Sequence, residues 1–562
     1  MTAISNAEAP GRLRWRRPKA VAVRAVGLAA IGLIACFANH DVAAPTGLIS
    51  VTAARFGIAL VVGFLWLVIT GTFGYGTAQR RDWVGIIPFL VALVVREVFT
   101  LHSVEEITLQ FAQGPVVKHS VVYALVQMFY IPLLRDDHWF TMHLNGVLGA
   151  AATLPLYLFV RQRVESHAAG FLCALFLAVH PIVARFAPTD APYSLLLATW
   201  FCGLALLSAS RVEPRALLGG GVLLGIAATA RVEGLVVLLA SAVLLEPRRL
   251  LASARAVPRV AIAAILIVAL LGALQASAIA EGFLGNSPAG SLTQVFKGLL
   301  IDVVWSNAYS PASLTALIWL GALIGIRKRF RLGLCAFIAA LIVAAPIVTS
   351  TNWVAALHRM VPACSMQAIV AGIGAYSLTA WLPLEKRRRW LATLPGILLA
   401  CHTVVAGRST LIERHAYNEE YDIVRTHLAP GGIPLPQCTL MILRSPTGDS
   451  LDLWSFAQVV PRLRVVECSQ VDCAKELSRG GCFYYLRTTA SYFHPDGVPR
   501  SCAVEIGSVD CVNEETVAVE SLMELEPVEA RIAKVAGNVP WERERYPARA
   551  SLGLFRARPR SR

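Results

Sequence analysis

PFLVALVVREVF (88–99) and QGPVVKHSVVYALVQMF (113–129) are two largely apolar stretches that flank a short polar segment. The first has the character of a membrane helix that runs out into water. Five ionisable or polar residues follow it or open the second stretch: Glu105, Glu106, Lys118, His119 and Tyr123. Ionisable groups at this depth are costly to maintain and therefore indicate function. The stretch predicts a membrane enzyme that handles a charged, lipid-linked substrate.

The whole chain has the composition of a polytopic membrane protein. Of its 562 residues, 56% are hydrophobic and 15% are charged, whereas about 25% are charged in a soluble domain. The net charge is +15, but the basic residues form short clusters between apolar runs, as cytoplasmic loops do. Nucleic acid is therefore not an expected partner. The basic N-terminal segment leads into apolar runs without a clear cleavage site, so no cleaved signal peptide is predicted.

Apolar runs of spanning length predict about thirteen transmembrane helices, because a helix needs roughly 20 residues to cross a bilayer. They lie near residues 20–38, 57–75, 83–101, 141–160, 168–185, 192–210, 216–230, 233–246, 259–280, 310–326, 332–350, 359–382 and 390–406. The basic clusters, from the 12–19 leader to residues 386–389, then all fall on one side, which the positive-inside rule makes cytoplasmic. The short pair around Arg231 is the weakest of these predictions and could be a re-entrant hairpin.

The part of the chain after about residue 407 is predicted to be extracytoplasmic. Residues 409–430 favour an amphipathic helix that ends at Pro430-Gly431-Gly432. Strand-like runs (QCTLMILR, RLRVVECS and GCFYYLRT) then alternate with helix-like segments near 449–460 and 470–479. This alternation predicts a small α/β domain with a largely parallel sheet. After Cys511 the pattern weakens, and the final ARPRSR is expected to be disordered.

Cysteine usage agrees with that topology. Six of the twelve cysteines lie in apolar runs and six lie in the tail: Cys438, Cys468, Cys473, Cys482, Cys502 and Cys511. An even number on an oxidising side predicts disulfides, although the sequence leaves their pairing open. Zinc is the less favoured alternative, because the tail has no CxxC pair and no His at finger spacing.

Several short motifs follow one another along the chain, and all but the one that ends at Arg161 lie on the predicted outer side. They are Glu105-Glu106; His119-Ser120-Val121-Val122-Tyr123; Gly146 to Tyr157 with Arg161; Pro181, Arg185, Asp190 and Tyr193; Thr229-Ala230-Arg231-Val232-Glu233; and His358-Arg359-Met360-Val361-Pro362-Ala363. Their order resembles the GT-C membrane glycosyltransferases, in the branch of protein O-mannosyltransferases, aminoarabinose transferases and RgtA/B/C/D-like enzymes. The resemblance covers roughly residues 85–480, and no single motif in it is specific.

The chain also departs from the family pattern. Glu105 stands where Asp is usual, Ser120 where Pro is common, and His143 where Arg is common. Two extra spans precede the family-like core.

The resemblance implies a mainly α, polytopic fold of GT-C type with a C-terminal extracytoplasmic α/β domain. The expected segments are a basic leader (1–19), two extra helices (20–82), a catalytic transmembrane core (83–406), a periplasmic α/β domain with six cysteines (407–520) and a weakly structured tail (521–562). It places the protein in a bacterial inner membrane with a cytoplasmic N-terminus.

The implied reaction moves a hexosyl or pentosyl group from a polyprenyl-phosphate carrier to an acceptor hydroxyl, with inversion. Such a transfer needs a base for the acceptor's proton and cations for the phosphate charge that develops. By resemblance Glu105 is the base, and Glu106 has a supporting or metal-binding role. The expected substrate-binding residues are Lys118, His119, Tyr123, Arg185, Asp190, Tyr193, Arg231, Glu233, His358 and Arg359.

The expected partners are the lipid-linked donor, membrane lipid and an acceptor that is a glycan, a lipid or a protein. No cofactor is predicted with certainty. A divalent metal is compatible with the acidic pair, but no set of metal ligands is predicted. Asp136-Asp137-His138 is interpreted as a polar turn rather than a metal cluster.

Each candidate residue also has a structural interpretation. Lys118 and His119 could be interface residues that reach toward the headgroups, and Asp190 could cap the following helix. Arg231 and Glu233 could pair within the bundle, as Arg96 and Glu97 are expected to do.

Two other functional classes stay open. The first is a transporter or flippase for lipid-linked sugars, although the sequence has no inverted duplication and its charges gather at the outer face. The second is a non-catalytic membrane scaffold.

Overall fold

The structure is a computed structural model that describes most of the helical core and of the C-terminal sheet. The described residues are 82–100, 138–189, 192–208, 214–231, 234–245, 251, 254–255, 257–274, 293, 296, 299–305, 310–348, 359–380, 393–411, 416–428, 438–443, 463–492, 512–533 and 550–560. The predicted leader, the two extra spans and the segment 449–460 lie outside them.

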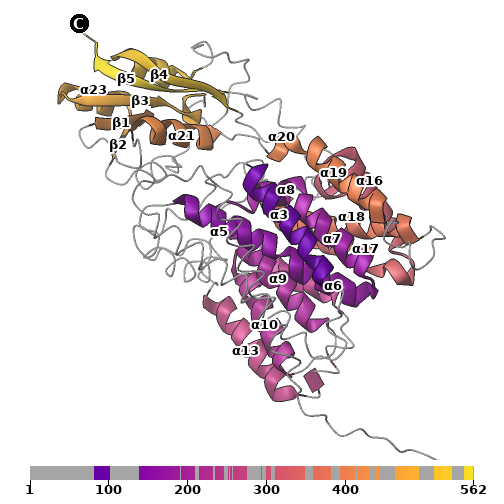
Figure 1. The fold of residues 1–562 in the computed structure, drawn as a ribbon. Helices are drawn as coiled ribbons and strands as arrows, with labels where there is room; N and C mark the ends of the chain where they lie inside the picture. Colours follow the sequence, from indigo (N-terminus) through magenta and orange to yellow (C-terminus); the bar gives the residue numbers. More distant parts are fainter. Residues whose placement is uncertain are drawn as a thin grey trace, which may run out of the picture.

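The chain forms a helical bundle followed by a five-stranded sheet (Figure 1). The bundle helices are α3 (Ile86–Val98), α5 (His138–Ala151), α6 (Thr153–Val164), α7 (His167–Val179), α8 (Pro181–Phe186), α9 (Tyr193–Leu207), α10 (Pro214–Thr229), α11 (Leu235–Leu244), α13 (Pro258–Leu274), α16 (Ala312–Ile324), α17 (Arg331–Val348), α18 (Val361–Ala380), α19 (Leu394–Ala406) and α20 (Arg408–Leu411). Three shorter helical turns, η1 (Asp82–Gly85), η4 (Leu299–Trp305) and η5 (Lys328–Phe330), accompany them. Most of these helices coincide within a few residues with a predicted span.

Two described helical segments, 328–347 and 361–379, are long and apolar enough to cross a membrane. Seven other apolar helices have 10–17 residues, so the predicted number of spans stays a prediction. The surface of α13 exposes Ile262, Ile265, Leu266 and Leu270, whereas charged residues such as Arg96 and Arg185 are buried. An apolar exterior around buried charges is the pattern that lipid favours.

Prolines break two of the predicted spans. The predicted 168–185 helix divides into α7 and α8 at His180, whose backbone is extended. Pro181 follows it, and a residue before proline is disfavoured in the helical conformation. The predicted 141–160 helix extends over 138–164 but is interrupted at Ala152. Pro155 contributes to this break, because it lacks the N–H that would bond the carbonyl of Ala151.

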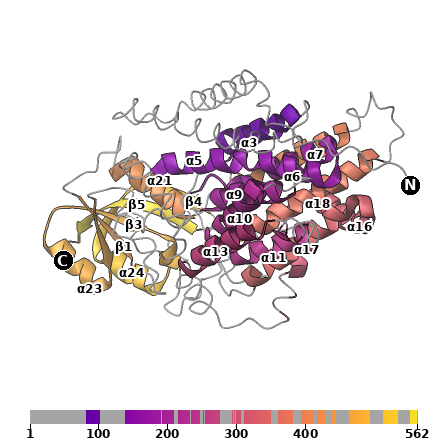
Figure 2. The ribbon, with the colours of Figure 1, turned by 90° about the horizontal axis from the view of Figure 1, so that it is seen from below.

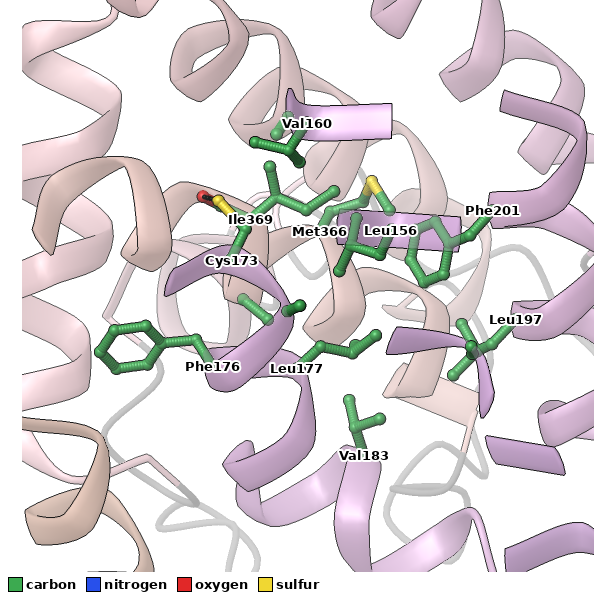
Figure 3. Close-up of a cluster of buried hydrophobic side chains, with 14 of the residues drawn as sticks. Leu156, Val160, Cys173, Phe176, Leu177, Val183, Leu197, Phe201, Met366 and Ile369 are labelled. Carbon is green, nitrogen blue, oxygen red and sulfur yellow. Dashed lines mark hydrogen bonds between the residues drawn. The ribbon is translucent and has the colours of Figure 1, made fainter. Parts of the chain in front are cut away.

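α18 is the central helix, and α7, α16 and α17 pack around it (Figure 2). A Cβ atom at Gly372 would lie 2.4 Å from the Cα of Cys173 on α7, and one at Gly374 would lie 2.3 Å from the carbonyl oxygen of Leu317 on α16. Glycine is therefore required at both crossings, as is common where membrane helices approach closely. Apolar side chains fill the space around this contact, among them Leu156, Phe176, Leu197, Phe201 and Met366 (Figure 3).

The C-terminal sheet has the strand order β2-β1-β3-β5-β4. Its strands are β1 (Cys438–Leu443), β2 (Arg464–Cys468), β3 (Cys482–Arg487), β4 (Met523–Ala533) and β5 (Ala550–Pro559). β2, β1 and β3 are parallel, with α21 (Ala416–Leu428), α23 (Gln470–Ser478) and α24 (Glu514–Glu520) beside them. The predicted α/β domain is therefore confirmed for these three strands. Within the predicted amphipathic helix 409–430, the described residues form α20 and α21.

The end of the chain differs from the prediction. β4 and β5 form an antiparallel pair, and β5 is also antiparallel to β3. The prediction of a weakly structured tail is therefore wrong for residues 523–533 and 550–559, and the predicted disorder at the C-terminus is wrong for 557–559. Burial in the sheet explains why this part of the chain is structured. Leu552, Leu554 and Ala557 of β5 are buried, and Leu554 and Ala557 belong to the two different apolar clusters of the domain.

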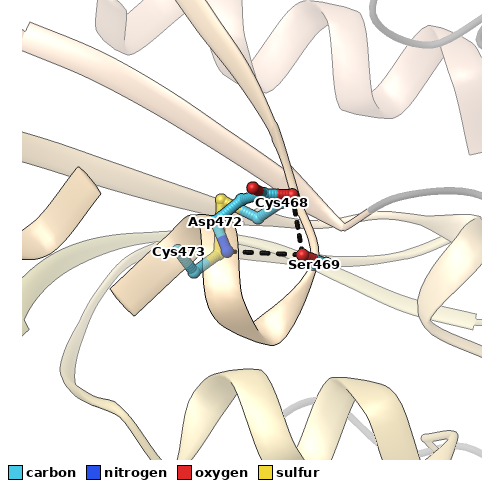
Figure 4. Close-up of a disulfide and its surroundings, with 4 residues drawn as sticks. All are labelled: Cys468, Ser469, Asp472 and Cys473. Atoms are coloured by element: carbon cyan, nitrogen blue, oxygen red, sulfur yellow. Dashed lines mark hydrogen bonds between the residues drawn. A yellow bond between two sulfur atoms is a disulfide. The ribbon is translucent and has the colours of Figure 1, made fainter. Parts of the chain in front are cut away.

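Two disulfides join the tail cysteines, as the sequence predicts. Cys438 and Cys482 connect β1 to β3 at paired positions, and Cys468 bonds to Cys473 across the start of α23. The Ser469 hydroxyl between them accepts a hydrogen bond from the amide of Asp472 at 3.3 Å and so caps this helix (Figure 4). Cys502 and Cys511 lie outside the described residues.

A charged network joins α21 to β4. Glu529 contacts His427 with an Nε2–Oε2 distance of 2.6 Å and also pairs with Arg531. Arg531 in turn donates to the buried Glu419 at 2.7 Å. Desolvation opposes the charge on Glu529, but hydrogen bonds from His427 and Arg531 outweigh it and lower the pKa of this carboxyl.

The requirement for glycine at the α7–α18 crossing can be tested by adding one methyl group at position 372. Gly372→Ala should destabilise the protein by about 1–3 kcal/mol, because the added Cβ meets backbone atoms that cannot rotate away. Gly272→Ala in α13 is the control, since no described atom lies within 4 Å of its added Cβ. Thermal unfolding of the purified protein in detergent measures the difference. Equal melting temperatures for the two variants would show that the helices do not cross this closely.

The Glu529 network predicts a pH-dependent contribution to stability. Because folding lowers the pKa of this carboxyl, its stabilisation is fully present above the unfolded value of about 4.3 and is lost as pH falls through the folded value. Glu529→Gln should therefore destabilise the protein at neutral pH and have a smaller effect below about pH 4. Thermal melts of both proteins from pH 3 to 7 test this, and a constant difference would contradict it.

Candidate active site

One end of the bundle collects most of the buried polar residues. Arg96, near the end of α3, donates to the carbonyl of Ala178 near the end of α7 at 3.2 Å. Asn145, in the middle of α5, donates to the carbonyl of Thr189 between α8 and α9 at 2.6 Å. A Cβ at Gly407, just after α19, would lie 2.7 Å from Pro181 at the start of α8. We call this the site end, and the C-terminal sheet lies beyond it (Figure 1).

Two arginines of the predicted site lie here, deeply buried. Arg185 of α8 is 1% exposed and stands 5.5 Å from the ring centroid of Phe186. Arg231, after α10, is 3% exposed and stands 4.6 Å from the ring centroid of Tyr193 at the start of α9. A cation over an aromatic face is worth about 2 kcal/mol when both are desolvated. The turn after α10 is thereby attached to the start of α9.

The turn between α8 and α9 is held against α5. Besides accepting from Asn145, Thr189 donates its hydroxyl to the carbonyl of Phe186 at 2.8 Å. Ser194 donates to the carbonyl of Ala187 at 2.8 Å. A Cβ at Gly149 of α5 would lie 2.8 Å from the Cβ of Ala187, so glycine allows the close approach. This turn leads directly to Asp190 and Tyr193, two of the predicted substrate-binding residues.

Arg96 and Glu97 lie beside that turn, inside the bundle as predicted. Arg96 is fully buried and close enough to Glu97 to interact with its charge. The Glu97 carboxylate lies against α5, where a Cβ at Gly146 would be 2.5 Å from its Oε1. Gly146 therefore makes room for this acid, and the same added Cβ would lie 3.3 Å from Pro188 in the turn.

A second polar group links α7, α18 and η4. The Gln367 side chain on α18 meets the His180 ring at the α7–α8 junction and donates to the carbonyl of Val303 at 3.1 Å. Trp319 of α16 donates to the next carbonyl, Val304, at 2.5 Å. Side chains thus bind consecutive carbonyls of η4, a π-helix that lies between the predicted spans 259–280 and 310–326. Irregular backbone of this kind is tolerated in membranes where protein side chains bond it.

The structure describes four of the predicted site residues: Arg185, Tyr193, Arg231 and Arg359. Arg359 is partly exposed and directly precedes α18, at the site end. The other predicted residues lie outside the described part of the chain: Glu105, Glu106, Lys118, His119, Tyr123, Asp190, Glu233 and His358. Among the described residues, no group of three His, Cys, Asp or Glu side chains could hold a metal ion.

Part of one motif lies away from the site end. Gly146 faces the α8–α9 turn, but Tyr157 and Arg161 lie at the opposite end of α5–α6. There Arg161 pairs with Asp82 at 3.2 Å, and the Tyr157 hydroxyl is 2.7 Å from Nδ1 of His167. These two residues secure η1 and the start of α7 and do not join the site.

Asn145, His180 and Gln367 are site-end residues that no motif predicts. The sequence signal for each of these residues is weak, because each is only a single polar residue in an apolar run or beside a proline. Their roles become visible once the helix ends meet, because each bonds or contacts an element far from it in sequence.

The fold is that of the GT-C membrane glycosyltransferases, as the order of motifs predicts. The chain is similar to ArnT from Cupriavidus metallidurans, an aminoarabinose transferase, in a crystal structure bound to undecaprenyl phosphate. The TM-score is 0.52 at 12% identity over 85% of this chain and 98% of that chain. For apo ArnT from the same organism the TM-score is 0.48 at 14% identity, over 84% and 97%. No family model and no curated protein matches the sequence.

The hydrogen bond from Asn145 should stabilise the α8–α9 turn. Asn145→Ala removes a bond to a buried carbonyl and should cost about 0.5–1.5 kcal/mol, with faster hydrogen–deuterium exchange in residues 187–196. Thr199→Val is the matched control, because its hydroxyl bonds only carbonyls of its own helix, such as that of Leu195 at 2.7 Å. Unchanged exchange in Asn145→Ala would show that α5 does not hold the turn.

Proposed function

We propose that this protein is a membrane glycosyltransferase that takes a sugar from a polyprenyl-phosphate carrier and transfers it to an acceptor hydroxyl on the extracytoplasmic face. The observation that carries the proposal is the fold, which matches nearly the whole of an aminoarabinose transferase crystallised with undecaprenyl phosphate. The gathering of buried arginines at one end of the bundle supports it independently.

The arginines suit the phosphate that leaves in such a reaction. As the bond between the anomeric carbon and the phosphate oxygen breaks, negative charge grows on the phosphate and must be stabilised. Arg185 and Arg231 are largely removed from water, where a fixed cation acts more strongly on charge than it does in solvent. Arg359 is at the same end and more exposed, which suits a first contact with the lipid phosphate. Lys118 and His119 are proposed to extend this cationic surface.

The acceptor hydroxyl must lose its proton as it attacks the anomeric carbon. In our proposal Glu105 takes this proton. Glu106 either orients the Glu105 carboxylate or holds a divalent cation. Phosphate is a good leaving group, so a single base suffices, in contrast to the two carboxylates of glycoside hydrolases. Tyr123, Asp190, Tyr193, Glu233 and His358 are proposed to bind the sugar or the phosphate.

The α8–α9 turn gives the proposed site its shape. The contacts of Asn145, Thr189 and Ser194 fix the backbone on either side of Asp190. Arg231 is oriented by the ring of Tyr193. Preorganised charges of this kind stabilise a transition state without having to rearrange during the reaction. The C-terminal α/β domain, which is proposed to be periplasmic, lies beyond this end and is placed to guide the acceptor.

The catalytic role of Glu105 and the role of Arg359 in donor binding can be distinguished by experiment. Glu105→Gln should lower transfer about 100- to 10,000-fold, the usual contribution of general base catalysis, while binding of undecaprenyl phosphate to the detergent-solubilised protein stays unchanged. Arg359→Gln should instead weaken that binding. Transfer is measured by comparing the glycans and lipids of a deletion strain that carries each variant or the wild-type protein.

Two outcomes would contradict the proposal. If the wild-type protein does not bind undecaprenyl phosphate, or if deletion removes no sugar from any glycan or lipid, the scaffold or transporter interpretation gains weight. If the Glu105→Gln variant restores the lost sugar to the deletion strain as fully as the wild-type protein does, the base is another residue.

A further inference from the structure

A strongly basic turn lies at the end of the bundle opposite to the proposed active site. It connects α16 to α17, and four of the five residues 327–331 are Arg or Lys. Phe330 packs edge-on against Tyr376 with a centroid distance of 5.9 Å. Tyr376 lies fifteen residues after the start of α18, about 22 Å along the helix at 1.5 Å per residue. The turn is therefore far from the site end.

One of these cations is held in place. Arg329 donates from Nη2 to the hydroxyl of Tyr376 at 3.1 Å. Its guanidinium carbon also lies 5.6 Å from the ring centroid of Phe330 and 5.9 Å from that of Tyr376. The residue is nevertheless exposed, and a guanidinium has five N–H donors. Arg329 thus presents a fixed cation with free donor capacity to its surroundings.

Acids of the described chain do not balance the charges of Lys328, Arg329 and Arg331. Within the described ranges, no Asp or Glu forms an ion pair with Lys328, Arg329 or Arg331. Exposed arginines of the C-terminal domain behave differently: Arg464 and Arg479 both pair with Glu476. Several like charges within one turn repel each other unless an anion from outside lies between them.

The surface beside the cations is apolar. Leu323 is 66% exposed and Ile326 is 77% exposed, on the last turn of α16 and just after it. A small inorganic anion gains nothing from such neighbours, and a nucleic acid or an acidic peptide would leave them in water. A molecule with an anionic head and a hydrocarbon tail matches both parts of the surface.

We propose that residues 326–331 form a binding site for an anionic phospholipid. The headgroup phosphodiester accepts hydrogen bonds from Arg329, with Lys328 and Arg331 adding charge, while the acyl chains lie along Leu323 and Ile326. Arginine suits this role because its planar guanidinium can donate two parallel hydrogen bonds to one phosphate. The site is separate from the proposed donor site and does not depend on the proposed function.

The test uses the full-length protein in a neutral detergent with dioleoylphosphatidylglycerol as the probe. Native mass spectrometry should show at least one lipid bound, with a raised melting temperature, whereas dioleoylphosphatidylcholine should bind much more weakly. Inorganic phosphate at the same concentration should have no effect. If inorganic phosphate raises the melting temperature as much as the lipid does, the site binds free anions and the lipid assignment is wrong.

Variants locate the site on the turn. Arg329→Gln should weaken lipid affinity about fivefold and the triple variant K328Q/R329Q/R331Q up to about a hundredfold, from about 1 kcal/mol per basic residue near an anionic headgroup. Tyr376→Phe keeps every charge but releases Arg329, and should weaken binding a few fold. The control with the same loss of charge is K475Q/R558Q/R560Q, three exposed residues of the C-terminal domain, which should bind as wild type does.

Melting temperatures without added lipid establish that each variant is folded. If the triple variant does not fold, Arg329→Gln and Tyr376→Phe still decide the question. Unchanged lipid affinity in both would overturn the proposal, as would an equal loss in the control.

Discussion

The contact between α7 and α18 is the constraint on which the rest of the bundle depends. At Gly372 the two backbones approach so closely that a single methyl group would collide with Cα of Cys173. The Cys173 thiol then donates to the carbonyl of Ile369 at 3.4 Å (Figure 3). Further toward the site end the same seam brings His180 to Gln367. A van der Waals contact in the apolar core thus fixes where the polar residues of the site end can meet.

The proposed membrane setting offers a reason why those polar residues gather at the helix ends. Within a helix the backbone satisfies its own hydrogen bonds, so a buried polar side chain in the middle of a span has few partners. At a helix end, free carbonyls are available, and Arg96, Asn145 and Gln367 each donate to one on another element. The bonds that stabilise the bundle therefore also fix the turns at the site end. In this protein the same set of contacts holds the helical bundle together and arranges the proposed site.

The sequence predicts the elements well, because hydrophobic length and proline positions are local properties. The acidic and basic motifs also predict the fold, because their order along the chain is preserved whatever the details of packing. The contact of Arg231 with Tyr193 is not predictable in this way, since it joins turns from different helix pairs.

The sequence does not predict the β4–β5 pair, for another reason. Apolar and charged residues do alternate in MELEPVEARIA, but a connection of sixteen residues separates the two strands in sequence, far longer than the short loop that identifies a hairpin.

The two ends of the bundle use arginine in different ways, and the difference has a physical meaning. Arg185 and Arg231 are almost fully buried and stand against aromatic rings. Burying a cation is costly, and a protein retains the arrangement when an anion or an aromatic face compensates for it. Arg329 also stands against aromatic rings, but it remains exposed. A buried cation can act on charge that appears during a reaction, whereas an exposed one is screened and acts mainly on a neighbour that is always present. This contrast supports both proposals, which place chemistry at one end of the molecule and contact with an anionic lipid at the other.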